Sequence, residues 1–90
     1  IMLNYLYTSQ FKKDYKLAKK QGKDINKLIK IIELLSQEKK LDSSCYDHIL
    51  SGVYNRHREC HIDPDWLLIY KVVNNDLILV RLGSHSDLFK

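Results

Sequence analysis

The stretch WLLIYKVVNNDLILVRL, residues 66–82, decides the fold of this chain. Two apolar runs, 66–73 and 77–82, flank the sequence Asn-Asn-Asp at 74–76, whose residue types tolerate the positive φ angles of tight turns. The pattern predicts a β-hairpin. Because both runs are apolar nearly throughout, we expect other parts of the chain to cover both faces of this sheet, one of them by helices.

A third strand is predicted before the hairpin. Residues 53–62 (VYNRHRECHI) alternate as strand residues do, and they end at an Asp-Pro-Asp turn in which Pro64 cannot donate to a strand ladder. The three strands should form an antiparallel meander. Residues 39–52 lack periodicity and predict a loop, and the final GSHSDLFK predicts a short tail.

The N-terminal part predicts one more strand and two helices. Residues 3–7 suit a short strand. Apolar residues at helical spacing follow, with Thr8 or Ser9 as the cap and a stop at Gly22. A second helix, capped by Asp24, should run to about residue 37 and fold back on the first.

The element order is therefore β-α-α-β-β-β. It predicts an α+β fold in which the antiparallel meander packs against the helical hairpin, as a single domain spanning residues 1–90.

Composition excludes several classes of protein. The formal net charge is +4, with 44% hydrophobic and 29% charged residues, which is typical of a globular chain and not of a disordered one. No apolar run approaches the roughly 18 residues of a membrane span, and no signal peptide is visible. Two cysteines outside any CxxC pair predict reduced, buried thiols. We expect a cytoplasmic protein without membrane contact.

The charge is unevenly distributed. Residues 10–40 carry ten lysines and four acids, whereas residues 41–90 carry five bases and seven acids. The second part also holds all three arginines and all four histidines. A lysine-rich helical hairpin is often only a solvated face, and it becomes a nucleic-acid footprint when other features agree.

Histidines and carboxylates are predicted to gather at one end of the meander. On a strand over 53–62, Glu59 and His61 share a face with Asn55 and His57. In the meander, the strands over 53–62 and 77–82 run in the same direction and end at the same end of the sheet. This brings His85, just after the later strand, toward His61. His48, on the entering loop, is placed to complete the cluster.

Three explanations of this cluster stay open from the residues alone. A metal site is disfavoured, because no pair has a helical HxxxH or HExxH context. The histidines can also be structural. General acid–base catalysis is the third explanation: two imidazoles flanking a phosphodiester can cleave RNA through its own 2′-hydroxyl, with no metal, while an arginine stabilises the charge on the phosphate.

Four pieces of sequence carry a family resemblance. They are Asp47-His48 with Leu50 and Gly52, Arg58-Glu59-Cys60-His61, the run from Pro64 to Tyr70, and Arg81-Leu82-Gly83-Ser84-His85 with terminal Leu88-Phe89. Together with FKKDYKLAKKQGKD near the N-terminus, they resemble the YafQ branch of the RelE/ParE toxin superfamily of bacterial type II toxin–antitoxin systems. The resemblance covers essentially the whole chain.

The resemblance implies a fold, an activity and partners. The fold is RelE-like, and the activity is that of a ribosome-dependent mRNA endonuclease that needs no cofactor and inhibits translation. The implied partners are the 70S ribosome with its mRNA and a DinJ-like antitoxin of the ribbon-helix-helix type. Operator DNA is implied only through the complex with that antitoxin.

The resemblance also implies site residues. The catalytic set falls on His48, His61, Asp65 and His85, with no metal. The proton of the 2′-hydroxyl would go to His48, His61 or Asp65, and His85 would protonate the leaving 5′-oxygen. Substrate-binding positions fall on Glu59, Trp66, Arg81 and Phe89, with Arg81 on phosphate and the two aromatic residues positioning bases or the tail. His57 matches no catalytic position.

Two rival functions stay open from the sequence. The first is a non-enzymatic poison of DNA gyrase on the same fold, as in ParE toxins, which would not need the histidine set. The second is a module that only binds RNA through its lysines, with an affinity that falls steeply with salt.

Overall fold

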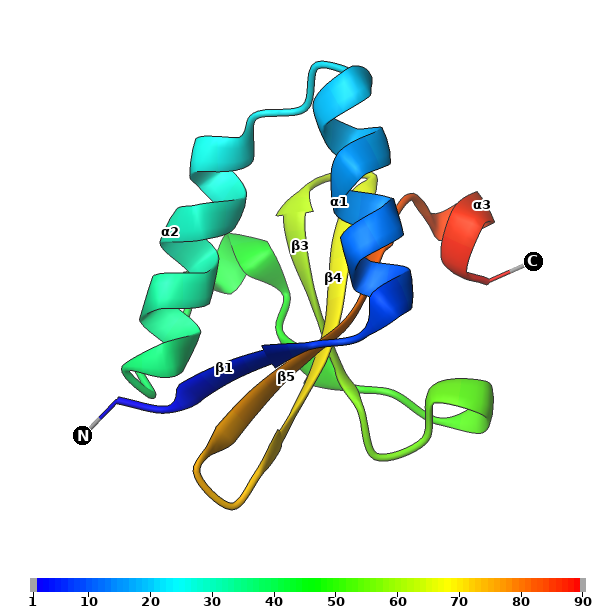
Figure 1. The fold of residues 1–90 in the computed structure, drawn as a ribbon. Helices are drawn as coiled ribbons and strands as arrows, with labels where there is room; N and C mark the ends of the chain where they lie inside the picture. The colour runs from blue at the N-terminus through cyan, green and yellow to red at the C-terminus, as the bar shows by residue number, and fades with distance from the viewer. Residues whose placement is uncertain (1, 90) are drawn as a thin grey trace.

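The computed structural model describes residues 2–89, so Ile1 and Lys90 of the predicted domain lie outside the described residues. A five-stranded sheet carries two helices on one face (Figure 1). The elements are β1 (Asn4–Tyr7), α1 (Ser9–Lys20), α2 (Ile25–Ser36), the 3-10 turn η1 (Ser43–Cys45), β2 (His48–Ile49), the 3-10 turn η2 (Gly52–Tyr54), β3 (Arg58–Asp63), β4 (Trp66–Val73), β5 (Asp76–Gly83) and α3 (His85–Leu88). The predicted α+β class is confirmed.

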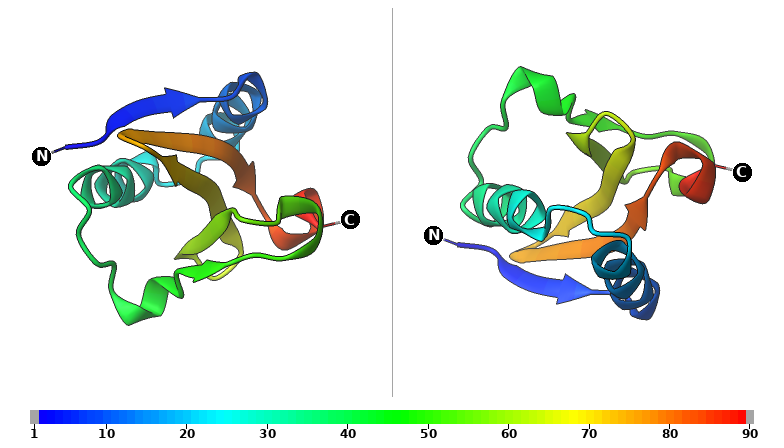
Figure 2. Two further views of the ribbon diagram at one scale, coloured as in Figure 1. Left: turned by 90° about the horizontal axis from the view of Figure 1, so that it is seen from below. Right: turned by 90° about the horizontal axis from the view of Figure 1, so that it is seen from above.

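The sheet has the order β1-β5-β4-β3-β2. Strands β3, β4 and β5 form the predicted antiparallel meander. The first strand joins the free edge of β5 in parallel, from Asn4 opposite Asp76 to Tyr7 opposite Leu79. In the sequence, α1 and α2 lie between β1 and the other four strands. Both helices lie across one face of the sheet, as the two views of Figure 2 show. The opposite face is covered in part by α3 and by Leu50 and Tyr54 from the segment before β3.

Both long helices begin at the predicted capping positions. Thr8, rather than Ser9, caps α1 by accepting a hydrogen bond from the Phe11 N–H at 3.0 Å, and its hydroxyl donates to the Val80 carbonyl of β5. Asp24 caps α2. Gly22 adopts a positive φ of 75° between the helices, which a glycine allows without steric cost.

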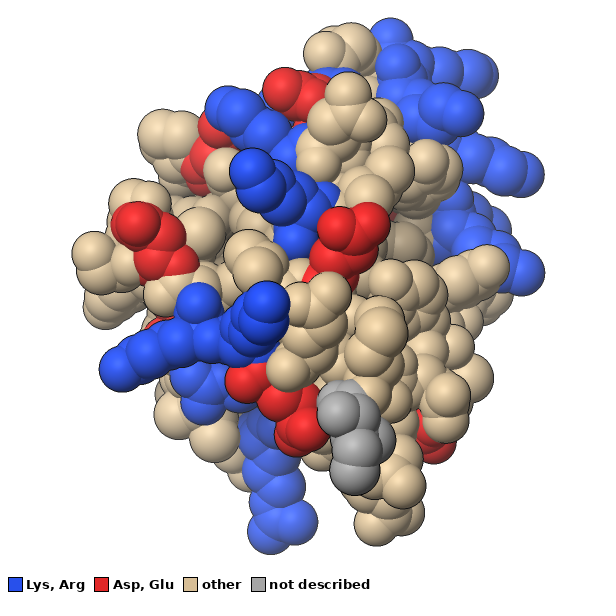
Figure 3. All heavy atoms as spheres, turned by 90° about the vertical axis from the view of Figure 1, so that its left-hand side faces the viewer, with Lys and Arg blue, Asp and Glu red and all other residues tan. Residues whose placement is uncertain are grey.

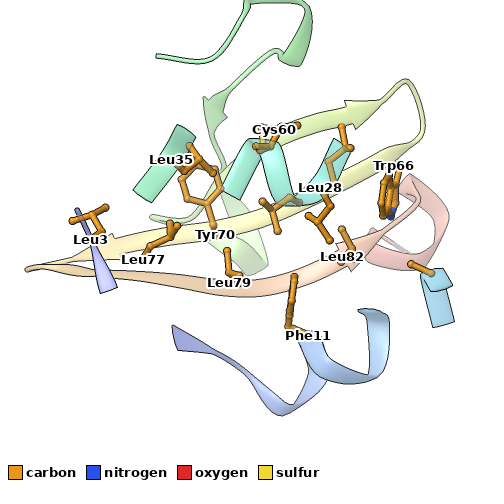
Figure 4. Close-up of a cluster of buried hydrophobic side chains, with 14 residues drawn as sticks. Leu3, Phe11, Leu28, Leu35, Cys60, Trp66, Tyr70, Leu77, Leu79 and Leu82 are labelled. Atoms are coloured by element: carbon orange, nitrogen blue, oxygen red, sulfur yellow. The ribbon is translucent and has the colours of Figure 1, made fainter. Parts of the chain in front are cut away.

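The main core lies between the sheet and the helical hairpin (Figure 4). Leu28 of α2 is fully buried there, and β4 contributes Trp66 at 2% exposure. Cys60 is buried and Cys45 partly buried, both as free thiols, and burial raises the pKa of each. Among residues 2–89, no helix is both long enough and apolar enough to span a membrane.

Three local predictions need correction. Strand β3 begins at Arg58 rather than at residue 53, because η2 and a positive φ at Arg56 bend the chain before it. The predicted loop 39–52 contains η1 and the two-residue strand β2, which pairs with β3. The predicted tail forms α3, which Ser84 and Asp87 hold through reciprocal hydrogen bonds between side chain and backbone.

Candidate active site

The candidate site lies on the sheet face opposite the helices. Strand register places His48, Glu59, Ile69 and Arg81 in one row across β2, β3, β4 and β5. The next row holds His61, Leu67 and Gly83. Beneath them is a second, smaller apolar cluster that joins the sheet to α3; its members are Leu50, Tyr54, Leu67, Ile69, Val80 and Leu88.

A buried carboxylate joins two of the histidines. Oε1 of Glu59 lies 3.5 Å from Nε2 of His48 and 3.4 Å from Nε2 of His61. The Glu59 side chain is only 5% exposed, so it sits below the two rings and not on the open surface. A carboxylate in this position is better placed to orient the two histidines than to bind substrate, which is the role that the resemblance implied.

A second carboxylate holds His85. Oδ1 of Asp65 accepts hydrogen bonds from the His85 backbone N–H at 2.9 Å and from its Nδ1 at 2.8 Å. The backbone hydrogen bond, followed by the one from the ring, lowers the pKa of Asp65. The turn between β3 and β4 is thereby tied to the start of α3. Because Nδ1 is engaged, Nε2 is the His85 nitrogen left for proton transfer.

The lowered pKa of Asp65 gives a testable pH dependence. A carboxyl group whose folded-state pKa is depressed stabilises the fold above its unfolded pKa, and that contribution is lost as pH falls through the folded value. We expect an NMR titration of the Asp65 carboxyl carbon to have a midpoint below the ordinary 3.8. The His85 amide proton should follow the same curve. A midpoint at or above 3.8 would contradict the two hydrogen bonds.

The two histidine–carboxylate pairs are neighbours. The His61 and His85 rings are 5.6 Å apart between centroids and nearly perpendicular. The meander produces this approach, because Leu67 of β4 is paired with His61 on one side and with Gly83 on the other. The chain turns into α3 directly after Gly83, and His85 is the first residue of that helix. The predicted gathering of these histidines is therefore confirmed in the geometry, with His48 joined through Glu59.

The loop that contains His48 is anchored by hydrogen bonds to the preceding residue, Asp47. Oδ1 of Asp47 accepts hydrogen bonds from the Tyr70 hydroxyl at 2.7 Å and from Nε of Arg58 at 3.1 Å. Burial, followed by the bond to Asp47, raises the pKa of Tyr70 well above its usual range, so the hydroxyl remains a donor. Sequence reasoning gave no role to this trio, because its members are separated in the chain.

Two other positions, Trp66 and Arg81, differ from the sequence-based expectation. The Trp66 ring is buried on the helix side of β4, so it is not placed to stack on a base. Arg81 donates to Asp14 through Nε at 2.8 Å and Nη2 at 3.3 Å, and to the Tyr54 hydroxyl; these bonds hold its guanidinium away from a free phosphate-binding position. His57, which matched no catalytic position, lies before β3 and outside the cluster.

Phe89 lies beside His85, at the C-terminal end of α3. Its side chain follows α3 and is 43% exposed, with its ring centroid 6.4 Å from that of His85 and 5.9 Å from that of Tyr54. An exposed ring next to His85 is available to stack on a base.

Three of these residues have the chemistry of a metal site. One ligand atom from each of Glu59, His61 and His85 lies within 4.8 Å of the others. Imidazole nitrogen and carboxylate oxygen suit Zn²⁺ and Cu²⁺. A bound ion would act there as a Lewis acid, and it would occupy the same lone pairs that proton transfer needs.

Comparison with known proteins gives close matches over the whole chain. Residues 3–90 match the model of a family described as bacterial toxin of type II toxin–antitoxin system, YafQ. The mRNA interferase toxin YafQ of Escherichia coli K12 is 42% identical over 92% of this chain and 91% of its own length. A copper-bound mutant toxin from Helicobacter pylori has a TM-score of 0.94 at 42% identity, covering 98% and 100% of the two chains. The E. coli DinJ–YafQ toxin–antitoxin complex gives 0.91 at 40% identity with full coverage of both chains.

The fold and the site together define a toxin of the RelE-like class. The five-stranded sheet with a helical hairpin on one face is shared with the solved YafQ structures. The chain belongs to the YafQ family of type II toxin–antitoxin systems, as the sequence resemblance implied. Relatives that are mRNA interferases support the endoribonuclease reading over the ParE-like gyrase poison.

Proposed function

We propose that this chain is an mRNA endonuclease that cuts messages on the ribosome by metal-free acid–base chemistry. The observation that carries the proposal is the pair of histidine–carboxylate dyads, Glu59–His61 and Asp65–His85, whose rings lie 5.6 Å apart. One dyad can accept a proton while the other donates one. The names of the E. coli relatives, mRNA interferases, support the same substrate.

The geometry favours His61 as the base and His85 as the acid. Asp65 is a poor base because hydrogen bonds lower its pKa. His48 has both nitrogens near acceptors, Nδ1 at 2.8 Å from the Tyr46 carbonyl and Nε2 facing Glu59. His61 would take the 2′-hydroxyl proton as the 2′-oxygen attacks phosphorus. The bond from phosphorus to the 5′-oxygen then breaks, and His85 protonates that oxygen. The products are a 2′,3′-cyclic phosphate and a 5′-hydroxyl.

The helical hairpin is the proposed contact for ribosomal RNA or for an acidic antitoxin segment. Residues 10–40, which include most of the hairpin and the segment directly after it, hold ten lysines and carry the positive charge. Figure 3 shows basic side chains spread over the side of the molecule that carries α2, with acidic ones between them. The DinJ–YafQ complexes support a DinJ-like antitoxin as the partner, with operator DNA bound through that complex. The cytoplasm is where these partners meet.

Mapping of mRNA 5′ ends in a translating extract tests the proposal. With the wild-type chain, we expect new ends within codons of translated messages, and the same RNA should stay intact when ribosomes are omitted. Growth inhibition with intact messages would contradict the proposal and favour the gyrase poison. Salt-sensitive RNA binding without any cleavage would favour the purely binding module.

Replacement of Glu59 tests the orienting role of this carboxylate. Glu59→Gln keeps the size of a side chain that is 5% exposed, but it removes the negative charge beside His48 and His61. Because that charge stabilises the imidazolium formed when a proton is accepted, we expect cleavage to slow on the order of tenfold or more. The control is Glu38→Gln, an exposed position outside the site. Wild-type rates in Glu59→Gln would contradict the role.

Metal chelation separates the two chemistries of the cluster. We expect EDTA-treated protein to cleave purified ribosome-bound mRNA at an unchanged rate, provided that the ribosomes keep their own Mg²⁺. Added Zn²⁺ or Cu²⁺ should slow cleavage by occupying the lone pairs of His61 and His85. Loss of activity in the chelated protein, with recovery on adding Zn²⁺ or Cu²⁺, would contradict metal-free catalysis.

A further inference from the structure

Tyr46 is an exposed aromatic residue held in an unusual backbone conformation. It follows η1 with φ 46° and ψ 53°, the left-handed region that residues other than glycine seldom adopt. The residue is 64% exposed, so burial of its ring does not explain the conformation. A strained backbone at an exposed residue indicates that neighbouring contacts impose it.

Those contacts hold the backbone on both sides of Tyr46. Its N–H donates to the Ser43 carbonyl at 3.1 Å, and its carbonyl accepts from Nδ1 of His48 at 2.8 Å. Asp42 accepts from the Ser44 N–H before it, and Asp47 is tied to Tyr70 and Arg58 after it. The Tyr46 ring therefore projects from an anchored turn rather than from a free loop.

The ring stands beside the proposed base. Its centroid lies 4.5 Å from that of His48 and 5.7 Å from that of His61, the second contact being nearly perpendicular. Phe89 stands beside the proposed acid, 6.4 Å from His85. The site thus has an exposed ring adjoining each of the two catalytic histidines.

We propose that Tyr46 is a stacking platform for the base on the 5′ side of the cut. This inference rests on the proposed ribonuclease function. The nucleotide that supplies the 2′-hydroxyl must lie next to His61, and the exposed ring adjoining His61 is that of Tyr46. The nucleotide that leaves with the 5′-oxygen lies next to His85 and Phe89. Since purines stack more strongly than pyrimidines, Tyr46 favours a purine 5′ of the cut.

The test compares four variants, Tyr46→Phe, Tyr46→Trp, Tyr46→Leu and Tyr46→Ala, by 5′-end mapping in a translating extract. The leucine of Tyr46→Leu still fills space over His48 but cannot stack on a nucleotide base. We expect Phe and Trp to cleave within about twofold of wild type, and Leu and Ala to lose on the order of tenfold, since base stacking on an aromatic residue contributes at this level. The loss should be concentrated at cuts with a purine on the 5′ side, with the 3′ preference unchanged.

Tyr5→Ala is the matched control, because Tyr5 is a 46% exposed tyrosine on β1, at the other edge of the sheet from β2. It should leave both the rate and the cut sites unchanged. Urea unfolding of each variant checks that the fold is kept. If Leu cleaves as Phe does, or if Ala keeps the wild-type rate and 5′ nucleotide distribution, the Tyr46 role is wrong while the ribonuclease stands. A wild-type chain that does not cut overturns both.

Discussion

His85→Ala is expected to lower mRNA cleavage about a thousandfold while leaving ribosome binding intact. General acid catalysis by a positioned imidazole contributes roughly a hundred- to ten-thousandfold. The substitution removes the ring that protonates the leaving oxygen, yet it keeps the backbone N–H that donates to Asp65 at 2.9 Å. Single-turnover cleavage of ribosome-bound mRNA and co-sedimentation with ribosomes measure the two quantities separately.

His57→Ala is the matched control for this variant, because His57 lies outside the cluster, with its ring 6.0 Å from that of Tyr54 between centroids. It should cleave at the wild-type rate. A substrate with sulfur in place of the leaving 5′-oxygen sharpens the assignment, because a thiolate leaves without a proton. That substrate should restore the rate of His85→Ala and not that of His61→Ala. Equal rescue of both would contradict the acid role of His85.

Asp14→Ala is expected to lower the free energy of unfolding by about 3 kcal/mol. Its carboxylate, 9% exposed, accepts hydrogen bonds from Nε and Nη2 of Arg81 and from the Leu82 N–H at 3.0 Å. Removing it leaves a half-buried guanidinium and a buried backbone donor without their partner. These bonds also join α1 to β5, so their loss weakens the attachment of the helix to the sheet. Urea denaturation measures the change.

The control is an exposed ion pair that also joins a helix to the sheet. Lys27 of α2 lies 2.7 Å from Asp63 of β3, with side chains 53% and 37% exposed. Because solvent screens such pairs, Lys27→Ala should cost less than about 1 kcal/mol. Equal losses in the Asp14 and Lys27 variants would contradict the structural role assigned to Asp14.

Much of the fold was predictable because local signals and periodicity agreed. Thr8, Asp24 and Gly22 mark helix ends through their own capping and turn chemistry, and the apolar runs of β4 and β5 are long enough to identify as strands. Strand β2 was missed because two residues have no period of their own and are defined only by pairing with β3. The start of β3 was predicted five residues too early. A positive φ at Arg56 interrupts the alternating pattern, and arginine is not a residue type from which a positive φ is expected.

The candidate site was predictable only in part. The meander topology brings His61 and His85 together, so their approach followed from strand order alone. The two dyads did not follow, because burial of Glu59 and the contact between Asp65 and the His85 N–H depend on tertiary packing. The surroundings of Arg81 were not predictable either. The sequence placed this residue on a phosphate, whereas its guanidinium is held by Asp14, which lies 67 residues away in the sequence.

The central claim is that the RNA supplies its own nucleophile to a pair of histidines. A ribosome-bound mRNA with a single 2′-deoxynucleotide on the 5′ side of a mapped cut tests it most directly. We expect no cleavage at that position, and a 2′,3′-cyclic phosphate with a 5′-hydroxyl at the same position in the all-ribose message. Cleavage of the deoxy-substituted message, with a 5′-phosphate on the downstream product, would contradict the account.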